Sequence, residues 1–215
     1  MTIDARSPEG RIPAPEALAL LRAGNERFAA NVRSVEALQS GLMRAEHAGR
    51  QQPFAIVLAC SDSRVPVEIL FDQGLGTLFV IRVAGNIVAP SQIGSIEYAA
   101  ERFGTRLVVV LGHSQCGAVG ATLEALSAPR GPSSRNQLSI VSRIRPAVDS
   151  VMSANRDLDA PRLWRECVRA NVRMAVAHLR QGSMLLEQLI LEDGMLIVGA
   201  EYDLVTGKVD FFEGV

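Results

Sequence analysis

Cysteine is scarce in this chain, and its scarcity limits the roles that the thiols can have. The 215 residues include 3 cysteines, at positions 60, 116 and 167. An odd number of cysteines, in a chain that does not open with an export signal, argues against a framework of disulfide bonds. We therefore expect these thiols to be metal ligands, nucleophiles or ordinary core residues.

The chain also lacks an excess of charge and any long apolar run. Its 22 Lys and Arg residues balance 23 Asp and Glu residues, for a formal net charge of -1. This balance gives no electrostatic reason to expect a nucleic acid or an anionic membrane as a partner. Apolar stretches such as residues 107–112 are far too short to span a bilayer, and the polar opening has no signal-peptide core. We therefore expect a cytoplasmic protein.

No internal repeat, low-complexity tract or glycine-rich phosphate loop is present. A nucleotide-binding protein of either common type would carry such a loop directly after its first strand. The composition, with 48% hydrophobic and 21% charged residues, is that of an ordinary globular protein. The length suffices for one large domain, so we expect residues 1–215 to form a single domain.

Short apolar runs rich in Val, Ile and Leu predict strands that are covered on both faces. These runs are residues 54–59, 77–83, 106–112 and 195–203. Helical patterns occupy residues 91–104, 116–126, 136–153 and 160–190, whereas residues 125–137 have the composition of a loop. The alternation predicts an α/β fold with a mainly parallel central sheet of about four strands, flanked by helices. A C-terminal antiparallel strand should follow a turn at Thr206 and Gly207.

An N-terminal helical arm is predicted over about residues 14–48. Its first segment, residues 14–31, places leucines at helical spacing, and Pro15 suits a first turn. A second helix-like segment covers about residues 35–48. Both segments need a surface to cover, and the pattern leaves open whether that surface is the sheet or a second subunit.

Side chains with metal-binding chemistry follow two of the predicted strands. Cys60 ends the first apolar run, and His113 and Cys116 follow the third. The carboxyl ends of parallel strands lie at one edge of a sheet, so the three side chains converge if these strands are neighbours. Two thiolates and an imidazole suit zinc, and three protein ligands leave a fourth position open, as in catalytic zinc sites.

Each of these residues also has a simpler interpretation. A single buried cysteine is more often a core residue than a ligand, and His113 alone could be a histidine satisfied at a strand end. The joint arrangement is what indicates a metal site. Cys167 lies in a helical pattern without a partner nearby, so we expect it to be a core residue.

A carboxylate and a guanidinium lie beside the first cysteine. Asp62 and Arg64 could form a hydrogen-bonded pair that only stiffens the turn. Close to a metal-binding cysteine, Asp62 could instead bind the metal, or accept a hydrogen bond from hydroxide on it. Arg64 would decide between these two roles by holding Asp62 away from the metal.

Together these motifs resemble the signature of the beta-class carbonic anhydrases. The resemblance rests on Cys60-Ser-Asp-Ser-Arg64, followed downstream by His113-x-x-Cys116-Gly117. Further similar segments are GNERF (24–28), FDQGLG (71–76), RVAGN (82–86) and GSIEYA (94–99). The resemblance extends from about Pro15 to the final strands.

The resemblance implies a role for each matching residue. Cys60, His113 and Cys116 would hold one zinc ion per subunit, and Asp62 and Arg64 would form the catalytic dyad. Residues that match the substrate-binding positions of the family are Gln51, Phe79, Ala84, Tyr98 and, through its backbone, Gly117. In the family the active site lies at a subunit interface, so a homodimer or a dimer of dimers is expected, with N-terminal helices that embrace the partner.

The resemblance also implies the reaction, the reversible hydration of carbon dioxide to bicarbonate and a proton by hydroxide held on zinc. Relatives with the same fold hydrolyse carbonyl sulfide or carbon disulfide, and this alternative stays open. A non-catalytic zinc protein or redox sensor, with Cys60 and Cys116 as a switchable pair, is a second alternative. Gln51 resembles the subgroup whose aspartate stays off the metal, whereas Trp164 does not match the bicarbonate site of the regulated subgroup.

The charges of the expected ligands predict the pH dependence of the activity. Water on a zinc ion held by three neutral histidines has a pKa of about 7. Here two thiolates would cancel the charge of the ion, so its water should be less acidic. We expect kcat/KM for CO2 hydration, measured by stopped flow, to rise into the alkaline range with an apparent pKa above that of a three-histidine site. A profile already flat below neutral pH would refute this expectation.

Overall fold

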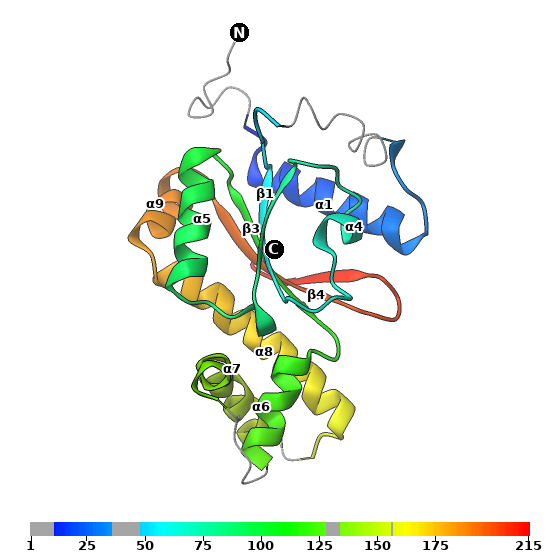
Figure 1. Cartoon of the computed structure of the whole chain (residues 1–215), viewed down its shortest axis with the longest axis vertical. Coiled ribbons are helices and arrows are strands. Elements are labelled where there is room, and N and C mark those ends of the chain that lie inside the picture. Colours follow the sequence, from blue (N-terminus) through cyan, green and yellow to red (C-terminus); the bar gives the residue numbers. More distant parts are fainter. Residues whose placement is uncertain (1–10, 36–47, 128–133, 156) are drawn as a thin grey trace.

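The fold is a five-stranded sheet with helices on both faces, in a computed structural model that describes residues 11–35, 48–127, 134–155 and 157–215 (Figure 1). The sheet has the strand order β2-β1-β3-β4-β5. The strands are β1 (Ala55–Ala59), β2 (Leu78–Arg82), β3 (Leu107–His113), β4 (Leu196–Tyr202) and β5 (Val209–Glu213). The first four strands are parallel to one another, and β5 is antiparallel to β4. The predicted α/β class and the antiparallel last strand are thereby confirmed.

The central strands are apolar along their whole length because both of their faces are covered. Every residue of β1 and β3 is buried. Side chains of alternate residues point to opposite faces of a strand, so Val57 and Val109 join one core cluster whereas Ile56 and Val108 join another.

Helices cover the sheet in two layers (Figure 1). On one face lie α1 (Ala14–Ala29) and the short α4 (Val67–Leu70). On the other lie α5 (Pro90–Arg102), α8 (Ala160–Gln181) and α9 (Met184–Glu192). Two more helices, α6 (Gly117–Ser127) and α7 (Arg135–Ala154), pack with the first half of α8 in a third cluster that includes Cys60 and Cys116. Within the residues described, we find no helix with both the length and the apolarity needed to cross a membrane.

The helix ends differ from the prediction at two places. The predicted loop at residues 125–137 is shorter, because α6 continues to Ser127 and the side chain of Ser134 caps the start of α7. The single pattern at residues 160–190 is two helices, because α8 ends at Gln181 with Gly182 as its C-cap, and Ser183 caps α9 by accepting from the backbone N–H of Leu186. Apolar spacing continues across that break and hides it.

The first segment of the predicted N-terminal arm is α1, and it covers the sheet of its own chain. Buried residues of α1 join the same core cluster as β1 and β3. The second segment, about residues 35–48, lies almost entirely outside the described residues.

A close backbone approach fixes α1 to the rest of the fold. A Cβ atom on Gly24 would overlap the carbonyl oxygen of Phe71. The adjacent Asn25 side chain donates to the carbonyl oxygens of Leu70 (3.2 Å) and Gly207 (2.9 Å), and it accepts from the N–H of Val209 (2.8 Å). This part of the GNERF motif is therefore a docking contact between three segments.

We expect Gly24→Ala to lower the free energy of unfolding by about 1–3 kcal/mol, because the added methyl group must displace backbone atoms. The matched control is Gly94→Ala in α5, where an added Cβ has no neighbour within 4 Å. That change should raise the free energy of unfolding by roughly 0.5–1 kcal/mol through helix propensity. Urea unfolding at one fixed protein concentration measures both, and equal stabilisation by the two changes would show that α1 is not docked as described.

Candidate metal centre

Three potential metal ligands meet at the carboxyl edge of the sheet. Cys60 directly follows β1, His113 is the last residue of β3, and Cys116 directly precedes α6. Because β1 and β3 are parallel neighbours, with Ala59 opposite Leu111, their carboxyl ends lie together. The two Sγ atoms and a ring nitrogen of His113 lie within 4.8 Å of one another, and all three residues are buried. The expected adjacency of the two strands is thus confirmed.

The imidazole of His113 is oriented so that it can bind a cation. Its Nδ1 lies 2.9 Å from the carbonyl oxygen of Ser114, and this contact assigns the ring proton to Nδ1. The lone pair of Nε2 then faces the cysteines. This atom is buried and has no hydrogen-bond partner among the described residues. An unpaired buried polar atom costs about 1–3 kcal/mol, and a bound cation would remove that cost.

The two sulfur atoms interact through a hydrogen bond that shifts their pKa values in opposite directions. The hydrogen bond from Cys116 lowers the pKa of Cys60 to about 4, with further lowering by His113 and by the backbone N–H of Gly85. The same contact and burial raise the pKa of Cys116. A divalent cation between the two sulfurs could bind both of them as thiolates.

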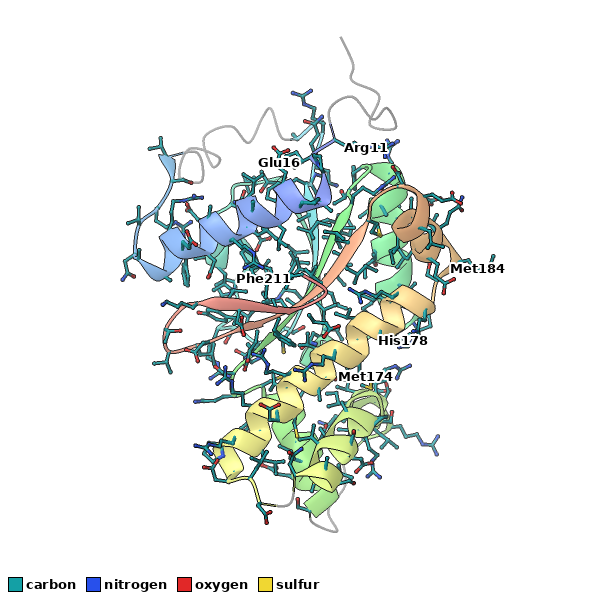
Figure 2. The ribbon with its side chains drawn as sticks, turned by 180° about the vertical axis from the view of Figure 1, so that it is seen from behind. Arg11, Glu16, Met174, His178, Met184 and Phe211 are labelled. Carbon is teal, nitrogen blue, oxygen red and sulfur yellow. The ribbon has the colours of Figure 1, made fainter. Side chains whose placement is uncertain are left out.

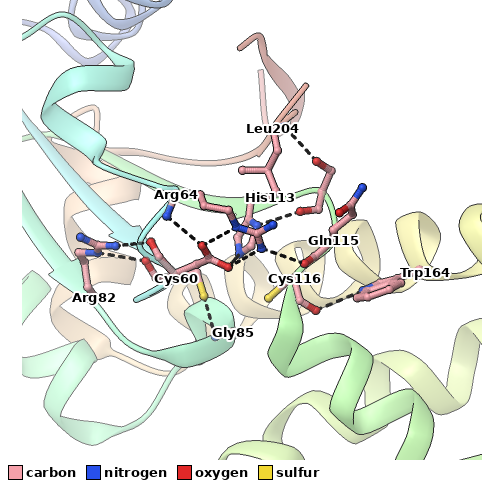
Figure 3. A network of polar contacts seen from close by, with 11 residues as sticks. Cys60, Arg64, Arg82, Gly85, His113, Gln115, Cys116, Trp164 and Leu204 are labelled. Atoms are coloured by element: carbon pink, nitrogen blue, oxygen red, sulfur yellow. Dashed lines mark hydrogen bonds and ion pairs between the residues drawn. The ribbon is translucent and has the colours of Figure 1, made fainter. Parts of the chain in front are cut away.

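The donor set fits zinc. Two thiolate sulfurs and one neutral imidazole nitrogen are the soft and borderline ligands that zinc takes in proteins, and three protein ligands leave one position for a water or substrate molecule. The backbone N–H of Gly85 donates to Sγ of Cys60 over 3.3 Å, so one sulfur already has the second partner typical of metal-bound thiolates (Figure 3).

Asp62 and Arg64 form an ion pair through two side-chain hydrogen bonds. Figure 3 shows Arg64 beside Cys60, His113 and Cys116. Nε and Nη2 of Arg64 donate to the two carboxylate oxygens over 2.9 and 2.7 Å, and the backbone N–H of Arg64 donates to Oδ1 over 2.9 Å. These hydrogen bonds hold the pKa of Asp62 well below its usual range. Oδ2 lies 3.8 Å from Nε2 of His113, too far for a hydrogen bond but adjacent to the position of a bound cation.

Other polar groups hold the loops of this edge, and their roles are not evident from the amino-acid sequence. Arg82, at the end of β2, donates to the carbonyl oxygens of Cys60 (3.1 Å) and Asp62 (2.6 Å). The hydroxyl of Ser114 accepts from the N–H of Leu204 over 3.0 Å. The signal in the sequence for Arg82 was an arginine at the end of an apolar run. Ser114 offered no signal, because its partner is a backbone group.

The substrate-binding positions expected from the resemblance fall into two groups. Ala84 lies in the short 3-10 helix η1 (Ala84–Asn86), next to the residue that contacts Cys60, and Gly117 directly follows Cys116. The other three lie elsewhere in the chain. Phe79 and Tyr98 pack with ring centroids 6.3 Å apart, and Gln51 and Tyr98 line a groove of about 620 Å³.

Strand β1 separates this second group from the cysteines. Gln51 precedes the strand and Cys60 follows it, and a strand of this length spans about 16 Å. Phe79 lies opposite Ile56 near the start of β1. Gln51, Phe79 and Tyr98 therefore lie away from the carboxyl end of β1, and the chain does not bring them to its own cluster of candidate ligands.

Comparison with known proteins assigns the chain to a family. The family described as carbonic anhydrase matches residues 55–209. The fold is similar to that of a tetrameric beta-carbonic anhydrase from Sordaria macrospora, with a TM-score of 0.73 at 22% identity, over 88% of this chain and 93% of that chain. The chain belongs to the beta-class carbonic anhydrases. The resemblance of its motifs to this family is thereby confirmed.

Curated carbonic anhydrases are similar to the chain over most of its length. One from Mycolicibacterium smegmatis is 40% identical over 190 residues, which cover 88% of this chain and 89% of the relative. Carbonic anhydrase 2 of Mycobacterium tuberculosis is 40% identical over 188 residues, 87% of each chain. Carbonic anhydrases are zinc-dependent lyases whose general activity is the hydration of carbon dioxide, and this chain has a Cys-His-Cys cluster that could bind a metal.

Proposed function

We propose that the chain catalyses the reversible hydration of carbon dioxide to bicarbonate and a proton, at one zinc ion per subunit held by Cys60, His113 and Cys116. The observation that supports this most directly is the convergence of two sulfurs and an unpartnered imidazole nitrogen within 4.8 Å. When bound, zinc would lower the pKa of a water molecule and so supply the nucleophile for the carbon atom of CO2.

The role of Asp62 in this proposal is to orient the attacking water molecule. Its carboxylate remains ionised through the neutral range, since the ion pair with Arg64 keeps its pKa low. An ionised carboxylate only accepts hydrogen bonds. It can therefore accept a hydrogen bond from the O–H of the attacking molecule, which leaves an oxygen lone pair of that molecule directed toward CO2. The proton released by the reaction leaves to solvent.

The role of Arg64 is to hold this carboxylate away from the metal. Both oxygens of Asp62 are engaged by the guanidinium, which also donates to the carbonyl oxygen of Gln115 over 3.4 Å. Arg82 steadies the same loop from the other side through the carbonyl oxygen of Asp62. A carboxylate fixed by this many donors pays a large penalty for swinging onto the metal, which favours the form of the site with an open fourth position.

A homodimer would complete the substrate cleft. Phe79 of edge strand β2 packs on Tyr98 of α5, and Tyr98 lines a groove with Gln51, away from Cys60, His113 and Cys116 of the same chain. Tyr98 is 54% exposed. We infer that Gln51, Phe79 and Tyr98 line the cleft of the partner subunit, where Gln51 would donate a hydrogen bond to a substrate oxygen and the rings would exclude water. Ala84 and Gly117 would line the cleft from within the same chain. The tetrameric relative from Sordaria macrospora is consistent with a dimer or a dimer of dimers.

The ligand assignment predicts that Cys60→Ser and His113→Ala each lose bound zinc and CO2 hydration. Stopped-flow hydration and zinc content are measured on the same purified sample, with carbonyl sulfide and carbon disulfide as alternative substrates. The control is Cys167→Ala, since Cys167 is buried in the third core cluster and lies outside the group of three ligands. The control should keep one zinc ion and its activity. Full zinc occupancy in either ligand variant would contradict the site as described.

The role of Asp62 predicts that Asp62→Asn keeps zinc and slows hydration roughly 10- to 100-fold, a typical loss when a partner of the metal site is changed. The amide is neutral and has one acceptor oxygen, so it cannot serve as the same acceptor and cannot form the ion pair with Arg64. Asp210→Asn is the control, because Asp210 pairs with Arg169 at the surface. Unchanged kcat in Asp62→Asn, or loss of its zinc, would rule out the orienting role.

A further inference from the structure

One helix contacts the backbone around all three proposed ligands, although it supplies none of them. Helix α8 crosses the sheet obliquely in the view from behind, where it carries Met174 and His178 (Figure 2). Trp164 and Asn171 of this helix are seven residues apart, which is about two turns, so they lie on the same face. Val168 lies between them and is buried.

Trp164 contacts the segment that carries Cys116. Its indole Nε1 donates to the carbonyl oxygen of Cys116 over 3.2 Å (Figure 3). The same carbonyl accepts the N–H of Gly120 in the first turn of α6. A Cβ atom on Gly120 would lie 2.7 Å from the indole ring, so the ring packs directly on the backbone of α6. The indole thus constrains the position of the first turn of α6, which Cys116 directly precedes.

Asn171 contacts the segment that holds Cys60. Its side chain is 2% exposed, and Nδ2 donates to the carbonyl oxygen of Gly85 over 2.9 Å. Gly85 in turn donates its N–H to Sγ of Cys60. Gly85 has a φ of +69°, and a Cβ there would lie 2.6 Å from Cδ1 of Ile144, so this turn has little freedom. An amide buried in a helix interface is costly unless it is hydrogen-bonded, and here its partner is the residue that contacts a ligand.

The third ligand is approached by packing. Gly112 precedes His113, and a Cβ atom on it would lie 2.6 Å from Cγ2 of Val172 and 3.3 Å from Cγ1 of Val168. The helix therefore lies directly against the backbone of β3 where this strand presents the imidazole. The backbone segments that carry all three ligands therefore contact the same helix, α8.

We propose that α8 is the positioning element of the metal centre, with Trp164 and Asn171 as its positioning residues for Cys116 and Cys60. The proposal rests on the proposed zinc site and extends it to residues that touch neither the metal nor the substrate. Their effect is on metal retention: they keep both sulfurs within reach of one ion in the apoprotein, so that binding requires no rearrangement of the backbone.

The test is the zinc affinity of the apoprotein, measured by competition with a chromophoric chelator. Asn171→Leu keeps the approximate volume and removes the donor, and Trp164→Phe keeps an aromatic ring and removes the N–H. We expect each to weaken zinc binding about 10- to 100-fold, as is usual for partners of metal ligands. Val176→Ala is the matched control. It truncates a buried side chain of the same helix in the core cluster that contains no ligand, and it should lower the unfolding midpoint while leaving zinc affinity within about twofold.

The absorption spectrum of the cobalt-substituted protein provides a second measurement, because it depends on how the two sulfurs are placed around the metal. In the cobalt-substituted protein, the thiolate-to-cobalt absorption bands should shift or weaken in Asn171→Leu and Trp164→Phe and remain unchanged in Val176→Ala. If circular dichroism shows that Asn171→Leu is unfolded, Asn171→Ala takes its place, and Trp164→Phe tests the proposal independently.

The outcomes separate this inference from the proposed function. Failure of the wild-type apoprotein to bind zinc would overturn the metal site itself. Zinc binding by the wild type with equal affinity in Asn171→Leu and Trp164→Phe would overturn only the role of α8. A loss of affinity in Val176→Ala as large as in the other variants would also overturn it, because the effect would then follow stability alone.

Discussion

The parallel pairing of β1 with β3 is the constraint on which the candidate metal centre depends. It places the end of one strand, where Cys60 lies, beside the end of the other, where His113 lies. Side chains alternate between the faces of a strand, so a slip of one residue would turn the apolar side chains of β1 toward the wrong core cluster. Full burial of both strands therefore specifies the register, and the register brings the ligands together.

Hydrogen bonds from polar side chains restrict the conformations of the loops at this edge of the sheet. Arg82 binds two carbonyl oxygens of the loop after β1, Asn171 binds that of Gly85, and Trp164 binds that of Cys116. Each of these donors comes from another element of the fold, so the geometry of the site depends on tertiary packing. Buried hydrogen bonds of this kind stabilise only modestly when formed and cost more when one partner is lost, so they favour a single arrangement.

Charge at the site is balanced in two separate units. Two thiolates would neutralise a zinc ion, and Asp62 is neutralised by Arg64 through two direct hydrogen bonds. The second unit is the more exposed one, with 49% of the Arg64 side chain accessible. A buried ligand set and an exposed ion pair, each without net charge, would suit the apolar substrate of the proposed reaction.

The sequence alone determined the order and type of the elements. Continuous apolar runs indicate strands buried on both faces, and helical spacing of apolar residues indicates helices buried on one face. It also determined which residues could bind a metal, because Cys60, His113 and Cys116 follow strand ends. Helix boundaries at Ser127 and Gly182 depended on local capping, which apolar spacing does not record. Only the tertiary structure separated Gln51, Phe79 and Tyr98 from the ligands of their own chain and revealed the contacts of Trp164 and Asn171. Those contacts end on backbone carbonyl groups, which every residue possesses, so no pattern of side chains could have predicted them.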